Sequence, residues 1–326
     1  MLAFFGVLLL GLLTFAFRKL PMTTPDVDNV VGVGESFFVN ASLSKENMTQ
    51  PGITFGVSIF KIDDSLFLNK TILTVSSWLI ASNTSKVFLY GPSNEIGLLG
   101  KDLIATLQSM FGPDRVIWKK GIKQRYHVLT VSELFSQLQE DADTELVAVI
   151  NSDIIVEREF MDIVTMVCNN FKEIKNWGMH TGRMDIPSQT HQRLFPLIGT
   201  PEFQKELSAF AHSYSGRLWG WGCDIFLWNR LGVFIGEHYY PPFLIGRPRF
   251  EYWFINEVRS FGVFLSPFPR YPVYHLDHPE REKWISKGDV PDNLWNAFVE
   301  WSNIQYKGFS NKKIRNTVNT DYVIFQ

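Results

Sequence analysis

The sequence predicts an α/β fold in which a mostly parallel sheet is flanked by helices. Between residues 53 and 150, four short apolar runs alternate with segments of helical spacing, and such alternation is typical of parallel strands joined by crossover helices. Gly91-Pro92 and Gly112-Pro113 punctuate this rhythm. Hydrophobic residues make up 45% of the 326 residues and charged residues 20%, which is enough apolar material for a large core.

The individual elements follow from periodicity. The first part of the chain predicts strands at residues 53–60, 86–90, 115–118 and 145–150, with helices at 66–80, 98–111 and 131–139. The later part predicts helices at 157–172, 201–211 and 249–261, with strands at 177–182 and 263–265. Because open α/β sheets bind ligands beyond the carboxyl ends of their strands, we expect the functional site after residue 150.

The beginning of the chain predicts a membrane anchor. Residues 2–17 are almost entirely apolar, slightly short of the roughly 20 residues that a spanning helix needs. No convincing cleavage site follows, which favours an uncleaved signal anchor over a signal peptide. We therefore divide the chain into an anchor at 1–20, a stem or linker at 21–50 and a single catalytic domain at 51–326.

The orientation of this anchor rests on two opposing signals. Arg18 and Lys19 follow the apolar segment and would hold that side in the cytosol. Four glycosylation sequons favour a luminal body, at Asn40, Asn47, Asn69 and Asn83. Their clustering predicts a single-pass membrane protein that faces the lumen of the Golgi or ER.

Charge and cysteine content exclude some classes of protein. The formal net charge is −2 and no long basic run occurs, so we expect no nucleic-acid partner. Cys168 and Cys223 are too few for a disulfide scaffold, and neither belongs to a Cys-x-x-Cys pair of a structural zinc site. Whether the two cysteines form one bridge is left open.

The strand predicted at 145–150 ends in Asn151-Ser152-Asp153. A carboxylate at this position points into the crevice where a ligand would lie. A divalent cation held by one or two carboxylates can bridge the diphosphate of a sugar nucleotide and stabilise it as a leaving group. Asp153 is therefore a candidate metal ligand, and the alternative is a helix cap or a plain turn.

A second candidate metal site lies at His275-Leu276-Asp277-His278. Imidazole and carboxylate groups are common metal ligands. In an extended segment His275 and Asp277 would share a face and His278 would point away. The alternative is a chance His-x-x-His pattern.

Two further segments carry candidate binding or catalytic groups. The glycines and aromatic residues of 219–224 would let rings stack on a ligand, with Asp224 accepting hydrogen bonds from sugar hydroxyls. Glu251 follows Pro248 near a predicted helix start and could act as general base on an acceptor hydroxyl. The alternatives are a packed aromatic turn and a surface glutamate that complements the helix dipole.

Taken together, these segments resemble the GT-A-type nucleotide-diphospho-sugar transferases, and especially a poorly characterised group among them. The resemblance spans roughly residues 53–278 and rests on five motifs in order. They are Asn151-Ser-Asp-Ile154, Gly182-Arg-Met-Asp185, Gly222-Cys-Asp-Ile-Phe226, the segment 241–254 with Pro-Pro-Phe-Leu-Ile-Gly-Arg-Pro, and His275-Leu-Asp-His278. The implied fold is a GT-A-like, Rossmann-type sheet.

The resemblance also implies a role for each residue. Asp153 would bind the metal and diphosphate, with His275 or His278 completing the site. Glu251 and Asp224 would serve the acceptor and the sugar, although Glu251 stands where the family usually has aspartate. The donor-binding set would be Asn151, Ser152, Arg183, Asp185 and Arg247. Asn151 replaces the first carboxylate of the usual two-acid metal motif.

The resulting hypothesis is a glycosyltransferase that uses Mn²⁺ or Mg²⁺, a nucleotide-sugar donor and a hydroxyl acceptor on a glycan, glycoprotein or glycolipid. The alternative is a non-catalytic protein of the same fold that binds glycans or scaffolds other transferases. A metal hydrolase built on His275, Asp277 and His278 is a third interpretation, which leaves the other four motifs unused.

Overall fold

The computed structural model describes residues 37–40, 50–59, 62, 64–91, 97–119, 124–125, 128–187, 189–213, 218–219, 224–232, 241–245, 250–267, 272–276 and 322–325. The chain divides into two compact units, Met1–Glu35 and Ser36–Gln326, and every described residue belongs to the second. The predicted anchor lies outside the described residues. None of the helices in the described ranges is long and apolar enough to cross a membrane.

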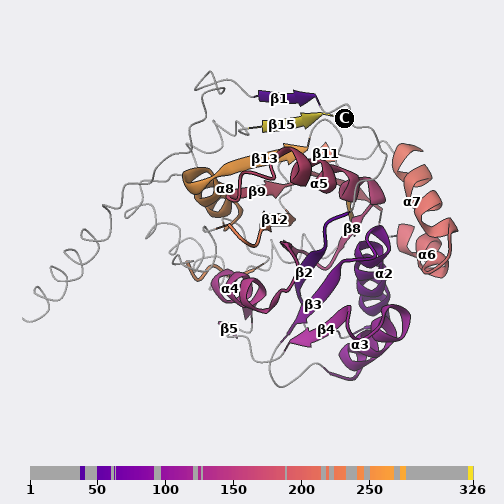
Figure 1. Cartoon of the computed structure of the whole chain (residues 1–326). Helices are drawn as coiled ribbons and strands as arrows, with labels where there is room; N and C mark the ends of the chain where they lie inside the picture. Colours follow the sequence, from indigo (N-terminus) through magenta and orange to yellow (C-terminus); the bar gives the residue numbers. More distant parts are fainter. Residues whose placement is uncertain are drawn as a thin grey trace, which may run out of the picture. The chain divides into compact units, whose positions relative to one another are not determined.

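A nine-stranded sheet forms the centre of the second unit (Figure 1). Its neighbouring strands are parallel except for β12, which runs antiparallel to both β7 and β9. The mostly parallel sheet predicted from the sequence is therefore confirmed. In spatial order the strands are Phe37–Asn40 (β1), Tyr322–Phe325 (β15), Val263–Pro267 (β13), Trp177–His180 (β9), Ile225–Asn229 (β12), Leu146–Ile150 (β7), Ile53–Ser58 (β2), Lys86–Tyr90 (β3) and Val116–Lys119 (β4).

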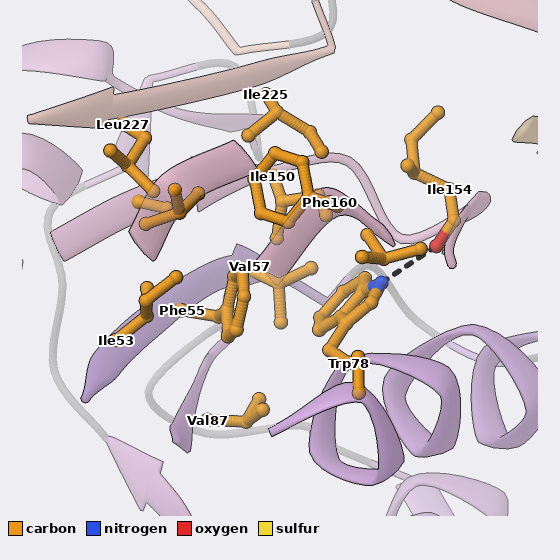
Figure 2. Close-up of a cluster of buried hydrophobic side chains, with 14 of the residues drawn as sticks. Ile53, Phe55, Val57, Trp78, Val87, Ile150, Ile154, Phe160, Ile225 and Leu227 are labelled. Atoms are coloured by element: carbon orange, nitrogen blue, oxygen red, sulfur yellow. Dashed lines mark hydrogen bonds between the residues drawn. The ribbon is translucent and has the colours of Figure 1, made fainter. Parts of the chain in front are cut away.

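Helices pack on both faces of this sheet because successive side chains of a strand point to opposite faces. Ile53, Phe55 and Val57 of β2 pack with one set of helices, and Trp78 inserts among them (Figure 2). Val147 and Val149 of β7 face the other way. The first face carries α2 (Ser65–Ala81), α3 (Gly97–Phe111) and α5 (Arg158–Asn170), and the second carries α4 (Val131–Asp141) and α8 (Phe250–Phe261).

The elements predicted between residues 53 and 150 are confirmed with small shifts of their ends. The later helices predicted at 157–172, 201–211 and 249–261 correspond to α5, α7 (Glu202–Ser213) and α8. Two differences concern the boundaries. The predicted stem contains β1, which pairs with β15, so the compact unit begins before residue 51. The strand predicted at 177–182 ends at His180, after which the chain enters a second sheet.

This second sheet has four short strands in the order β11-β10-β14-β8. Its strands are Leu218–Trp219 (β11), Arg183–Ile186 (β10), Val273–Leu276 (β14) and Ile154–Val156 (β8). Two of its strands follow directly from strands of the large sheet, with short crossings from Ile150 to Ile154 and from His180 to Arg183. Both crossings start at the carboxyl ends of large-sheet strands. The small sheet therefore lies beyond the carboxyl edge of the large sheet.

One face of the small sheet is apolar, and the other carries charged side chains on β10 and β14 beside buried apolar residues of β8. Ile186, Tyr274 and Leu276 pack in an apolar cluster with residues of α6 (Thr190–Leu194) and α7. Arg183, Asp185 and His275 occupy the alternating positions of the same strands. Because strand side chains alternate, the packing behind the sheet forces the charged side chains onto the opposite face.

Helix α2 covers the edge strand β8 with polar side chains. The Thr74 hydroxyl donates to the Ser152 carbonyl at 2.7 Å, and the Trp78 indole N–H donates to the Ile154 carbonyl at 2.7 Å (Figure 2). The Ser77 hydroxyl accepts from the Val156 amide at 3.0 Å. These bonds satisfy the backbone groups that a neighbouring strand would otherwise pair. The helix thereby fixes the segment that follows β7.

Two sequon asparagines and Cys168 lie in this unit and do not contribute to the site. Among the sequon asparagines, Asn83 lies in an exposed turn after α2 and Asn69 is partly buried within α2. Cys168 in α5 is a free cysteine, and burial raises the pKa of its thiol to about 12. Cys223 lies outside the described residues.

We predict that the Thr74 hydroxyl stabilises the protein through its bond to Ser152. Thr74→Val keeps the shape but leaves the partly buried Ser152 carbonyl without this donor, which we expect to cost about 1–2 kcal/mol. Thr165→Val is the matched control, because the buried Thr165 hydroxyl bonds only the Met161 carbonyl of its own helix. Urea unfolding of the two variants measures the difference. Equal losses of stability would contradict the role given to Thr74.

Candidate functional site

The site is centred on the turn of residues 151–153, which links the two sheets. The Asn151 amide donates to the Asp224 carbonyl at 3.1 Å, which ties the start of the turn to β12. The Leu276 amide donates to the Asp153 carbonyl at 3.0 Å, which ties its end to β14. With Thr74 bonded to Ser152, three separate elements hold three consecutive residues. The side chains of the turn therefore start from a rigid backbone.

His275 lies between two carboxylates. Its Nε2 is 3.1 Å from Asp153 Oδ2, and its Nδ1 is 3.0 Å from Asp185 Oδ1. Burial alone would lower the pKa of His275, but the carboxylates of Asp153 and Asp185 outweigh it and raise the pKa to about 9. The ring is therefore protonated at neutral pH, and both of its nitrogens donate hydrogen bonds.

Arg183 extends this series of hydrogen-bonded charged side chains beyond Asp185. Its Nε donates to Asp185 Oδ1 at 3.2 Å, and its Nη1 donates to Asp224 Oδ2. Burial would lower the pKa of Arg183, but Asp224 and Asp185 raise it above its ordinary value. The side chains of Arg183 and Asp224 are each only 9% exposed, so this ion pair is desolvated. Removing Arg183 would leave the buried carboxylate of Asp224 without this cation.

Asn151 is the last member of this series of hydrogen-bonded side chains. Its side-chain Nδ2 donates to Asp224 Oδ1 at 2.7 Å. Each carboxylate oxygen of Asp224 therefore accepts a hydrogen bond, one from Asn151 and one from Arg183. The chain of side chains begins and ends on the same turn. We call it the strand-end ring, and its members in order are Asn151, Asp224, Arg183, Asp185, His275 and Asp153.

Among the charged members of the ring, Asp153 is the most open to solvent. The Asp153 side chain is 28% exposed, against 17% for Asp185 and 4% for His275. Three carboxylates and two cations give the ring one net negative charge when His275 is protonated. A ligand arriving from solvent would therefore meet a carboxylate first, and a cation would be attracted to it.

The ring contains six of the residues that the sequence singled out separately. Ser152 lies in the same turn and is partly buried, with its carbonyl bonded to Thr74. Arg247 and His278, together with Asp277, lie outside the described residues. Asp224 is buried and bonded through both oxygens, an arrangement that differs from the sugar contact expected for it.

Glu251 lies toward the same edge of the large sheet. It belongs to the first turn of α8, which ends at Phe261, just before β13 starts at the opposite edge. The ring of Phe250 is 5.3 Å from that of Phe226, which is two residues after Asp224. Glu251 is partly exposed. Glu251 therefore starts α8 toward the edge of the sheet where a ligand would bind.

The metal expected from the sequence can be tested against these groups. Within the described ranges, no group of three or more His, Cys, Asp or Glu side chains is arranged to hold a metal ion. Both ring nitrogens of His275 are hydrogen-bonded to carboxylates, Nε2 to Asp153 and Nδ1 to Asp185. The partly exposed carboxylate of Asp153 fits a single ligand, which suffices for an ion that takes its other ligands from water and substrate phosphates.

Some residues that shape the site were missed from the sequence. Thr71, Thr74 and Ser77 form a polar stripe at helical spacing on α2, and this spacing can be recognised in the sequence. His180, at the carboxyl end of β9, is fully buried, and burial lowers its pKa to about 4. It is therefore neutral at physiological pH. No pattern in the sequence distinguished it.

Comparisons with known proteins place the chain among distant structural neighbours. No protein-family model matches the chain, and no curated protein matches it in sequence. M. tuberculosis glucosyl-3-phosphoglycerate synthase aligns with a TM-score of 0.39 and 10% identity, covering 80% of this chain and 82% of that one. S. aureus TarS 1-349 aligns with a TM-score of 0.30 and 9% identity, covering 41% of this chain and 36% of that one.

We predict that protonated His275 makes the stability of the metal-free protein depend on pH. Its pKa is higher in the folded than in the unfolded protein, so its contribution is complete below about pH 6.5 and is lost as the pH rises through about 9. The stability difference between the wild type and His275→Gln should therefore shrink from pH 6 to pH 9.5. Urea unfolding in EDTA measures it. A difference that stays constant or grows with pH would contradict a protonated His275.

Proposed function

We propose that this protein is a GT-A-type glycosyltransferase that transfers a sugar from a nucleotide donor to a hydroxyl acceptor. The observation that carries the proposal is the strand-end ring. Its members come from four motif segments of the resemblance, with bonded side chains up to 122 positions apart in sequence, and they meet beyond the carboxyl edge of the sheet. Ligands of open α/β folds bind at this edge. Unrelated surface residues would have no reason to converge there.

The donor would bind over the turn of residues 151–153. Asp153 would hold Mn²⁺ or Mg²⁺ through its exposed carboxylate, with Asn151, Ser152 and Arg247 contacting the donor. A bound divalent cation would bridge the two phosphates and stabilise the charge that develops as the diphosphate leaves. The net negative charge of the ring supports a cation as the link between this site and an anionic donor.

The transfer forms a bond between the acceptor oxygen and the anomeric carbon while the bond from that carbon to the diphosphate oxygen breaks. The acceptor hydroxyl loses its proton to a base. Glu251 is the proposed base, because it is partly exposed and starts α8 toward the same edge. Asp224 has both oxygens bonded, so we assign it to holding Arg183 and Asn151 instead of to the sugar.

The setting of the enzyme follows from the first part of the chain. We propose that residues 1–20 anchor the protein in a Golgi or ER membrane and that the body faces the lumen. The acceptor would then be a glycan, glycoprotein or glycolipid. The exposed turn at Asn83 can carry a glycan without disturbing the core, which supports this orientation.

A second candidate function is a non-catalytic protein that binds nucleotide sugars or glycans. Two observations favour it: Asn151 replaces a carboxylate of the metal motif, and Asp224 is occupied by Arg183 and Asn151. Such a protein would bind donors in the presence of Mn²⁺ and release no nucleoside diphosphate with any acceptor. Turnover therefore separates the two functions.

We predict that Asp153→Asn abolishes donor turnover in the full-length protein. The neutral amide cannot hold the cation, and we expect the rate of nucleoside diphosphate release to fall at least about 100-fold. The assay uses UDP-glucose, UDP-galactose, UDP-N-acetylglucosamine and GDP-mannose with Mn²⁺, and calorimetry follows binding.

Asp162→Asn is the matched control, because Asp162 is an exposed aspartate of α5. It should leave turnover unchanged. Full turnover by Asp153→Asn would remove Asp153 from the site. A wild type that binds none of these donors would contradict the proposed function itself.

A further inference from the structure

His275 contacts Asp153, in the turn of residues 151–153, from the side that is buried in the protein. Its side chain is 4% exposed, whereas the Asp153 carboxylate that it bonds is 28% exposed. A ligand that reaches Asp153 from solvent would find both nitrogens of His275 already engaged by carboxylates. The arrangement therefore separates a residue that can touch the ligand from one that lies behind it.

The backbone makes this separation rigid. Asp185 and His275 are register partners on the parallel strands β10 and β14. Asp185 therefore lies directly beside the imidazole of His275, to which it is hydrogen-bonded. β14 also pairs with β8, and the Leu276 amide binds the Asp153 carbonyl. Asp153 is therefore tied to β14 through both its backbone and its carboxylate. Oδ2 of Asp153 is fixed, and the direction of the whole carboxylate is fixed with it.

The strand-end ring also holds the side chain of Asn151, at the start of the turn. Asn151 donates through Nδ2 to Asp224, which directs its Oδ1 away from that carboxylate. Arg183 bonds both Asp224 and Asp185. It therefore links the residue that holds Asn151 to the residue that holds His275. A buried charged chain of this kind holds a defined geometry only while every member is paired.

We propose that His275 is a positioning residue, which holds the Asp153 carboxylate through Nε2, is itself oriented by Asp185 at Nδ1, and binds neither the metal nor the donor. This inference rests on the proposed function for the ligand that Asp153 holds. It replaces the metal-ligand role that the sequence suggested for His275. Ligating groups are commonly oriented by such partners, whose loss typically weakens metal binding about 10–100-fold.

The test follows binding of Mn²⁺ with UDP, and of Mn²⁺ with GDP, to the full-length protein in detergent. Calorimetry gives the affinity, and electron spin echo measurements on bound Mn²⁺ detect a directly coordinated imidazole nitrogen. We expect the wild type to bind the Mn²⁺ complex without such a nitrogen. Asp153→Asn should lose binding, whereas His275→Gln and Asp185→Leu should keep it with affinity reduced about 10–100-fold.

Two further variants guard against a merely structural effect. Asp185→Asn retains a carbonyl that can accept from Nδ1, so it should recover most of the affinity lost in Asp185→Leu. His191→Gln is the matched control, because His191 is buried in α6, on the opposite side of the small sheet, and should leave affinity unchanged. Circular dichroism establishes that each variant is folded.

The contrary outcomes are distinct. A directly coordinated nitrogen that disappears in His275→Gln would make His275 a ligand and overturn the inference while keeping the proposed function. Unchanged affinity in His275→Gln would also overturn the inference. A wild type that binds neither Mn²⁺–UDP nor Mn²⁺–GDP would overturn the inference and the proposed function together.

Discussion

The strand-end ring is the constraint on which the arrangement of the site depends. Six polar side chains from five strands or strand ends form a chain of hydrogen bonds that starts at Asn151 and returns to Asp153. Several of these groups are buried, and a buried charge is tolerated only when it is paired. The pairing therefore fixes the positions of the strands that carry the charges. It also leaves Asp153 as the most open carboxylate.

The packing around the ring explains how four short strands can hold it. An apolar cluster with α6 and α7 covers one face of the small sheet, and the alternation of strand side chains turns Arg183, Asp185 and His275 to the other. On the edge of that sheet, α2 supplies hydroxyl and indole groups to β8 in place of another strand. A small sheet needs an apolar face or a packed helix to be stable, and these contacts supply both.

Six of the nine strands of the large sheet were predicted from the sequence, whereas β1, β12, β15 and the strands of the small sheet were not. Parallel strands buried on both faces appear as continuous apolar runs, as in residues 146–150, and crossover helices separate them clearly. The strands of the small sheet have only two to four residues, which is too short for a periodic signal, and β10 carries charges at alternate positions. Pairing between strands distant in sequence is also invisible without the fold.

The site residues could be recognised as candidates, but their partners could not. The motifs marked Asp224 and Arg183, yet nothing in the sequence indicated that a residue expected to face a sugar would bond an arginine 41 positions earlier. Likewise, His275 was interpreted as a metal ligand because histidine near a carboxylate suits both roles. The proposal that His275 positions Asp153 instead rests on the place of Asp185 beside the imidazole ring, which the register of β10 and β14 sets.

The most direct test is a crystal structure of the full-length protein with UDP and Mg²⁺. The account predicts one ion about 2.0–2.1 Å from a carboxylate oxygen of Asp153 and in contact with the diphosphate. His275 Nε2 would remain hydrogen-bonded to Asp153, and Nδ1 to Asp185. An ion coordinated by His275, or a nucleotide bound away from the turn of residues 151–153, would contradict the account.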